Sequence, residues 1–122
     1  ELKIYGNDYQ TKDGSGERDY IHILDLIDGH FSAIDFILKN HGEKIFNLGT
    51  GISTSVIELI KTFESVNSIE IPFKFAKRRS GDVAICYADP SLAEEVLEWQ
   101  AKYNLNDMCI DAWSGVKDHG FN

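Results

Sequence analysis

Positive charge, cysteine and long apolar runs are all scarce in this sequence. Twelve lysines and arginines face 20 aspartates and glutamates, which gives a net charge of −8 and argues against a nucleic acid or an anionic membrane surface as the main partner. No apolar run approaches the roughly 20 residues of a membrane span, so no membrane partner is expected. No secretory signal is visible either.

The two cysteines, Cys86 and Cys109, form no disulfide framework and lack the spacing of metal ligands. A cytoplasmic, reducing compartment is the simplest fit to this usage. The 122 residues suit one domain with a modest core. Because the chain begins at Glu1 without a methionine and enters an apolar run at once, we expect a piece of a longer protein.

Short strand-like and helix-like segments follow one another without regular βαβ units. Alternating or apolar runs predict strands at 2–5, 18–23, 44–48, 72–75 and 83–87. Apolar residues at helical spacing predict four helices. Asp25 caps the first, the second begins near Thr54 or Ser55, Asp89 or Ser91 caps the third, and the last begins at Leu105. The sequence therefore predicts a small α/β domain of mixed topology.

Two turns place arginines at defined points of this acidic chain. Glycines at 14 and 16 precede Arg18, and the turn at 77–82 carries Arg79 and Asp82. A guanidinium can grip a phosphate with two donors, and a carboxylate can accept hydrogen bonds from sugar hydroxyls. Read from the residues alone, both turns also fit a solvated surface, the commoner fate of such side chains.

A third glycine turn, Gly49-Thr50-Gly51, lies between a predicted strand and a predicted helix. A dinucleotide fingerprint needs another glycine three positions on, where this chain has Thr54. We interpret this segment as a tight strand-to-helix turn rather than a phosphate loop.

The sequences of several segments resemble motifs of a known family. Residues 13–23 read Asp-Gly-Ser-Gly-Glu-Arg-Asp-Tyr-Ile-His-Ile, similar to the substrate-domain motif of UDP-glucose 4-epimerases, Asp-Gly-Thr-Gly-x-Arg-Asp-Tyr-Ile-His-Val. These enzymes belong to the extended short-chain dehydrogenase/reductases. The resemblance continues through Tyr5–Tyr9, Asn47–Gly51 and Arg78–Ala84, so that it spans residues 2 to about 113.

The resemblance implies a small mixed α/β substrate-binding domain over residues 1–122, without the Rossmann domain that would bind NAD. It implies a UDP-sugar as substrate, exchanged between UDP-galactose and UDP-glucose by oxidation and reduction at C4. A homodimer is one candidate assembly for the full-length enzyme. A UDP-glucuronate epimerase, a nucleotide-sugar dehydratase and a non-catalytic nucleotide-sugar module are the alternatives.

The resemblance also assigns site residues. Arg18 and Arg79 match the two arginines that contact the diphosphate, and Asp82 matches the aspartate on the ribose. Tyr5 stands at the aromatic position beside the uracil ring. Cys86 stands at a position of the sugar pocket where a small residue leaves room for an N-acetyl group, although it would equally suit a small buried hydrophobe.

The family's catalytic Tyr-x-x-x-Lys pair has no match here. The five tyrosines are followed four places on by Tyr9, Asp13, Leu24, Ser91 and Asp107. We therefore assign no catalytic residue and expect the chain by itself to be inactive as an epimerase.

Overall fold

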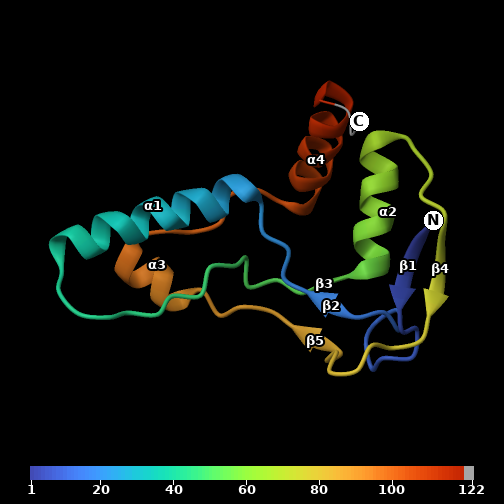
Figure 1. The fold of residues 1–122 in the computed structure, drawn as a ribbon, viewed down its shortest axis with the longest axis horizontal. Coiled ribbons are helices and arrows are strands. Elements are labelled where there is room, and N and C mark those ends of the chain that lie inside the picture. The colour runs from blue at the N-terminus through green and yellow to red at the C-terminus, as the bar shows by residue number, and fades with distance from the viewer. Residues whose placement is uncertain (120–122) are drawn as a thin grey trace.

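The computed structural model describes residues 1–119, which form four helices and five strands (Figure 1). The elements are, in order, β1 (Leu2–Tyr5), β2 (Glu17–Arg18), α1 (Ile23–Lys39), β3 (Thr54–Ser55), α2 (Val56–Asn67), β4 (Phe73–Ala76), β5 (Ile85–Cys86), α3 (Ser91–Leu97) and α4 (Leu105–His119). The predicted α/β class with mixed topology is confirmed.

The strands form two small sheets. In the first, β1 runs parallel to β4, with Leu2 opposite Phe73. In the second, β2 is central, antiparallel to β3 and parallel to β5. Figure 1 shows the second sheet in the middle of the molecule, between an end built from α1 and α3 and an end that carries α2, β1 and β4.

The helices are positioned by a few buried contacts. Trp99 is 2% exposed, and its indole nitrogen donates to the Asp25 carbonyl (3.1 Å). A Cβ added at Gly29 of α1 would lie 2.8 Å from Leu48 and 3.1 Å from Trp99, so only glycine allows this approach. At the other end of the molecule α2 packs against α4, and Cys109 is buried.

The first predicted helix starts earlier than expected and is capped by a different residue. Strand β2 ends at Arg18 because its neighbour β5 ends at Cys86, so the predicted strand over 18–23 is wrong beyond its first residue. His22 is the N-cap of α1, and its Nδ1 accepts from the amide of Leu24 (3.1 Å). Asp25 is instead buried and accepts from the amides of Lys102 (3.1 Å) and Tyr103 (3.0 Å). The predicted cap at Ser55 is confirmed, since its Oγ accepts from the Glu58 amide (3.0 Å).

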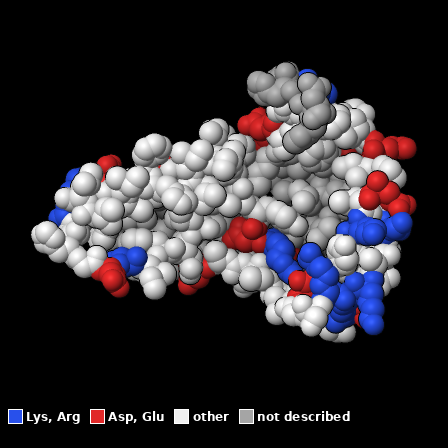
Figure 2. Space-filling model, viewed as in Figure 1, with Lys and Arg blue, Asp and Glu red and all other residues white. Residues whose placement is uncertain are grey.

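Residues 44–48, predicted as a strand, form no strand in the structure. Within residues 1–119 no strand pairs with them, and Ile45 is 87% exposed. The nearby helix α1 carries an exposed apolar stripe of seven side chains, between 44% and 78% exposed, made of Ile23, Leu24, Ile27, Phe31, Ile34, Ile37 and Leu38. In Figure 2 the end of the molecule formed by α1 is mostly uncharged. A stripe of this kind is typical of a helix whose partner surface lies outside the described residues.

None of the helices among residues 1–119 combines the length and the apolar character needed to cross a membrane.

Candidate functional site

Strand β2 brings the predicted site residues together. It pairs with β5 so that Arg18 lies opposite Cys86, and the amide of Asp19 donates to the Cys86 carbonyl (3.2 Å). On its other side Arg18 lies opposite Thr54 of β3. The predicted diphosphate arginine and the predicted sugar-pocket cysteine, distant in the sequence, are therefore neighbours in one sheet.

Arg18 and Arg79 converge on one carboxylate, that of Asp82. Arg79 Nε donates to Asp82 Oδ2 (3.0 Å), and Arg18 Nη2 lies 4.0 Å from Asp82 Oδ1. Asp82 is the most protected of the three, with 24% of its side chain exposed against 63% for Arg79. Gly81 lies in this turn at φ +87°, where a side chain would be strained. Two permanent cations thus flank one acceptor at the rim of a cavity.

Tyr5 completes this group. The Arg79 guanidinium carbon lies 4.7 Å from the centre of the Tyr5 ring, a cation–π distance. The cavity that these side chains share has a volume of about 260 Å³, and its lining includes Tyr5, Tyr9, Arg18, Tyr20, Arg79 and Asp82. Four of the five predicted site residues therefore lie around one cavity, which we call the arginine cavity.

Tyr20 is a residue of this cavity that the sequence did not single out. Burial raises the pKa of its phenol, and the charge of Arg18 opposes that rise only in part. The phenol therefore stays neutral at neutral pH and offers an O–H donor to a ligand.

Cys86 lies in a neighbouring cavity rather than in the arginine cavity. Cys86 is an exposed residue with a free thiol. This second cavity, which we call the cysteine cavity, has a volume of about 420 Å³ and is lined in part by Arg18, Asn47, Leu48, Cys86, Ala88 and Asp89. Arg18 lines both cavities, so the two adjoin at its side chain.

The local charge of this region differs from that of the whole chain. Although the net charge is −8, Figure 2 shows lysine and arginine side chains gathered at the end of the molecule that carries β1 and β4. Part of this charge is paired, since Lys74 lies 2.5 Å from Glu1 and Arg78 lies 2.6 Å from Asp8.

Asp19, beside Arg18, is a second residue of this region that sequence reasoning missed. Its carboxylate accepts from the amides of Thr50 (3.0 Å), Gly51 (3.0 Å) and Ala88 (3.2 Å), and from the Thr50 hydroxyl (2.6 Å). The only signal for it in the sequence is its place inside the motif at 13–23, since the three amides come from distant segments.

These contacts also decide what the turn at Gly49–Gly51 can hold. A dinucleotide pyrophosphate would need backbone amides that point into an open loop. The amides of Thr50 and Gly51 already donate to Asp19. The residues present do not fit a pyrophosphate at this turn, as expected. The predicted strand-to-helix setting is wrong, because residues 44–48 form no strand and β3 lies between the turn and α2.

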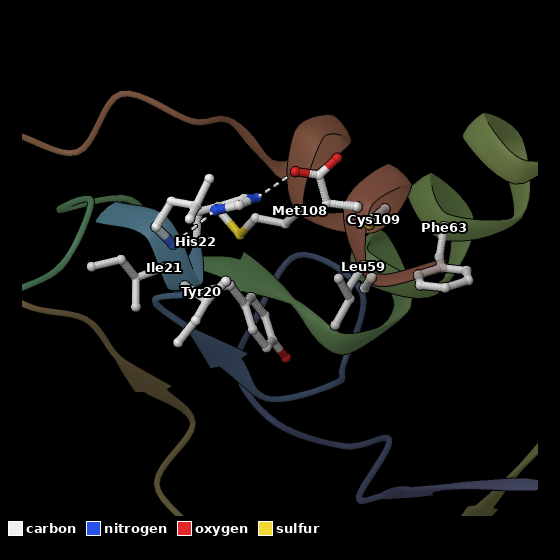
Figure 3. A pocket seen from close by; sticks show the side chains of 11 residues that line it. Tyr20, Ile21, His22, Leu59, Phe63, Met108 and Cys109 are labelled. Atoms are coloured by element: carbon white, nitrogen blue, oxygen red, sulfur yellow. Dashed lines mark hydrogen bonds and ion pairs between the residues drawn. The ribbon is translucent and has the colours of Figure 1, made fainter. Parts of the chain in front are cut away.

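A larger, apolar cleft lies on the other side of Tyr20, between the start of α1 and helices α2 and α4 (Figure 3). Its volume is about 600 Å³. His22 lies at its edge, 3% exposed and stacked on Tyr103, with Nδ1 capping α1 and Nε2 3.2 Å from Asp111 Oδ2. Both ring nitrogens are engaged in contacts that fix α1 and α4, so His22 has a structural role.

A mixed α/β domain with paired arginines at a small cavity suits a substrate domain that recognises a charged ligand. The chain belongs to the family described as GDP-mannose 4,6 dehydratase, whose model matches residues 1–112. Among curated relatives it is 50% identical over 113 residues to the UDP-glucose 4-epimerase of Bacillus subtilis (strain 168), covering 93% of this chain and 33% of that protein. To the UDP-glucose 4-epimerase of Homo sapiens it is 47% identical over 118 residues, covering 97% and 34%.

Solved structures give the same result. The UDP-glucose 4-epimerase of Stenotrophomonas maltophila, crystallised with NAD and formylated UDP-arabinopyranose, matches with a TM-score of 0.93 at 42% identity, covering 97% of this chain and 35% of that one. The enzyme of Bifidobacterium longum, in complex with NAD⁺ and UDP, matches with a TM-score of 0.90 at 45% identity, covering 99% and 36%. The resemblance to UDP-glucose 4-epimerases is confirmed, and the chain spans about a third of the length of these relatives.

Proposed function

We propose that this chain is the UDP-sugar-binding part of a UDP-glucose 4-epimerase. The observation that carries the proposal is the convergence of Arg18 and Arg79 on Asp82 beside the ring of Tyr5. In that arrangement a diphosphate displaces the Asp82 carboxylate from the two guanidinium groups, because it offers more negative charge and more acceptor oxygens. Asp82 is then free to accept from the ribose hydroxyls, and Tyr5 lies beside the uracil ring.

The two adjoining cavities suit the two ends of such a ligand. The nucleotide occupies the arginine cavity, Arg18 contacts the diphosphate where the cavities meet, and the sugar extends toward Cys86. Cys86 is exposed and much smaller than a tyrosine, so it leaves space beside the sugar for an N-acetyl group.

We further propose that the active enzyme contains a preceding NAD-binding domain that supplies the catalytic tyrosine and lysine. The coverage of about a third of each relative supports this, as does the exposed apolar stripe of α1. Residues 44–48, which have the pattern of a strand but no partner among residues 1–119, fit the same arrangement. We expect the full-length enzyme to act in the cytoplasm, with a homodimer as its candidate assembly.

The proposal is tested in two steps. Calorimetry with UDP on the full-length enzyme should give a defined dissociation constant, and UDP-galactose with NAD⁺ should yield UDP-glucose. The same assay on residues 1–122 alone should give no turnover above the blank, because the tyrosine–lysine pair is missing. Turnover of UDP-glucuronate in place of UDP-galactose would favour the glucuronate epimerase instead, and UDP binding without turnover of either sugar would favour a non-catalytic module.

A further inference from the structure

Asp19 connects the two sides of the cysteine cavity. Its backbone amide donates to the carbonyl of Cys86, and its carboxylate accepts from the amide of Ala88. The segment that carries Cys86 is therefore held at two points by one residue. The same carboxylate accepts from Thr50 and Gly51, at the turn after Leu48, which lines the same cavity.

The Asp19 carboxylate packs tightly against the backbone at Gly49. A Cβ added at Gly49 would lie 2.6 Å from Asp19 Oδ2 and 2.6 Å from Ala88 Cβ, closer than real Cβ contacts allow. Gly49 is itself buried. The turn at residue 49, the carboxylate and the segment after β5 therefore form one tightly packed unit.

We propose that Asp19 is a positioning residue for the sugar end of the site, which fixes the segment of Cys86 and Ala88 relative to Arg18. This inference rests on the proposed function. Asp19 itself lines the cysteine cavity. Both of its carboxylate oxygens are already engaged, Oδ1 by Thr50 and Oδ2 by Gly51 and Ala88, so Asp19 acts through the segments that it holds rather than on the ligand.

The hydrogen-bond donors around the Asp19 side chain require a carboxylate at this position. Three backbone N–H groups and one hydroxyl point at Asp19, and an ionised carboxylate is an acceptor at both oxygens. An asparagine would present an NH₂ group to some of these donors and leave at least one amide unpaired. Asp19→Asn keeps the size of the side chain and removes both this acceptor capacity and the negative charge.

Asp25 provides a matched control. It is also a carboxylate that accepts from two backbone amides, those of Lys102 and Tyr103, and it is 1% exposed. It lines neither the arginine cavity nor the cysteine cavity. Asp25→Asn therefore disturbs the fold by the same chemistry at a site remote from the proposed ligand.

The experiment compares Asp19→Asn, Thr50→Val and Asp25→Asn in the full-length enzyme. For each variant we measure the dissociation constant of UDP, kcat and KM for UDP-galactose, and hydrogen exchange of the amides at residues 50, 51 and 88. Thr50→Val removes the hydroxyl that donates to Asp19 and accepts from the Ile52 amide, and it keeps the Asp19 carboxylate, so it remains informative if Asp19→Asn does not fold.

In Asp19→Asn we expect faster exchange at residues 50, 51 and 88 and a fall of about tenfold or more in kcat/KM, since small misplacements of a bound substrate are costly. The dissociation constant of UDP should change by less than about threefold, because the side chains of Tyr5, Arg18, Arg79 and Asp82 make no hydrogen bond to Asp19. Thr50→Val should change the same quantities in the same direction by less. Asp25→Asn should lower the unfolding temperature and leave kcat/KM at the parent value.

The outcomes separate this inference from the proposed function. A parent enzyme that binds no UDP refutes the proposed function, and the positioning role falls with it. A parent that binds UDP normally, together with an Asp19→Asn variant of unchanged kcat/KM, refutes the positioning role alone. Equal losses of kcat/KM in Asp19→Asn and Asp25→Asn also overturn it, because they would reduce Asp19 to a general contribution to stability.

Discussion

Replacing Arg79 by alanine tests the arginine cavity most directly. Arg79 and Arg78 are adjacent in the sequence but make different contacts. Arg79 donates to Asp82 and lies over Tyr5, whereas Arg78 donates to Asp8 (2.6 Å) and lies 4.0 Å from the Tyr9 ring centre. Only Arg79 is among the residues that line the arginine cavity. Arg78→Ala is therefore a control of equal charge and size.

The expected magnitude follows from these contacts. Hydrogen bonds to a charged group contribute about 1.5–3 kcal/mol, which corresponds to a rise of about 10- to 140-fold in the dissociation constant of UDP. If Arg79 binds the diphosphate as proposed, the ligand must displace the ion pair of Arg79 with Asp82. Because 63% of the Arg79 side chain is exposed, this competing pair contributes no more than about 1 kcal/mol and places the expected loss in the lower part of that range.

Titration calorimetry of UDP on the full-length enzyme measures this loss. Arg78→Ala should change the dissociation constant by less than about threefold, since a screened surface charge acts weakly at a distance. If Arg79→Ala and Arg78→Ala weaken UDP binding equally, the effect is one of general charge and the assignment of Arg79 to the diphosphate is refuted. An unchanged constant in Arg79→Ala would remove this residue from the site.

Two further predictions concern selectivity and acid stability. Cys86→Tyr fills space in the cysteine cavity, so kcat/KM for the UDP-N-acetylhexosamine pair should fall much more than kcat/KM for the plain hexose pair. Equal losses on both pairs, or a parent enzyme without N-acetylhexosamine activity, would contradict the assignment of Cys86 to the sugar pocket. Although burial acts to raise the pKa of Asp13, hydrogen bonds from Ser15 and Ser55 hold it below the ordinary value of 3.8. Its contribution to stability is therefore present above the unfolded-state value of 3.8 and is lost as the pH falls through the lower folded-state pKa, so Asp13→Asn should flatten the decline of the unfolding temperature below about pH 4. Parallel declines in the variant and the parent would rule out this contribution.

Local sequence signals were sufficient for much of the fold. Strand β1, the cap at Ser55 and helix α2 follow from alternation, from the serine–glutamate spacing and from an apolar stripe at helical spacing. These signals act within a few residues, so no knowledge of distant contacts was needed. The sequences of the motifs were likewise sufficient to identify the resemblance to epimerases and to predict Arg18, Arg79 and Asp82 as site residues.

The features that needed the tertiary structure all depend on partners far along the chain. The length of β2 is limited by where β5 ends, and Asp25 serves as an acceptor for residues 102 and 103 rather than as a cap. The run at 44–48 has the pattern of a strand but pairs with nothing among residues 1–119. Asp19 collects amides from two distant segments, Thr50–Gly51 and Ala88. A sequence records which groups a residue can offer, but which donors and acceptors meet them is decided only when distant segments pack together.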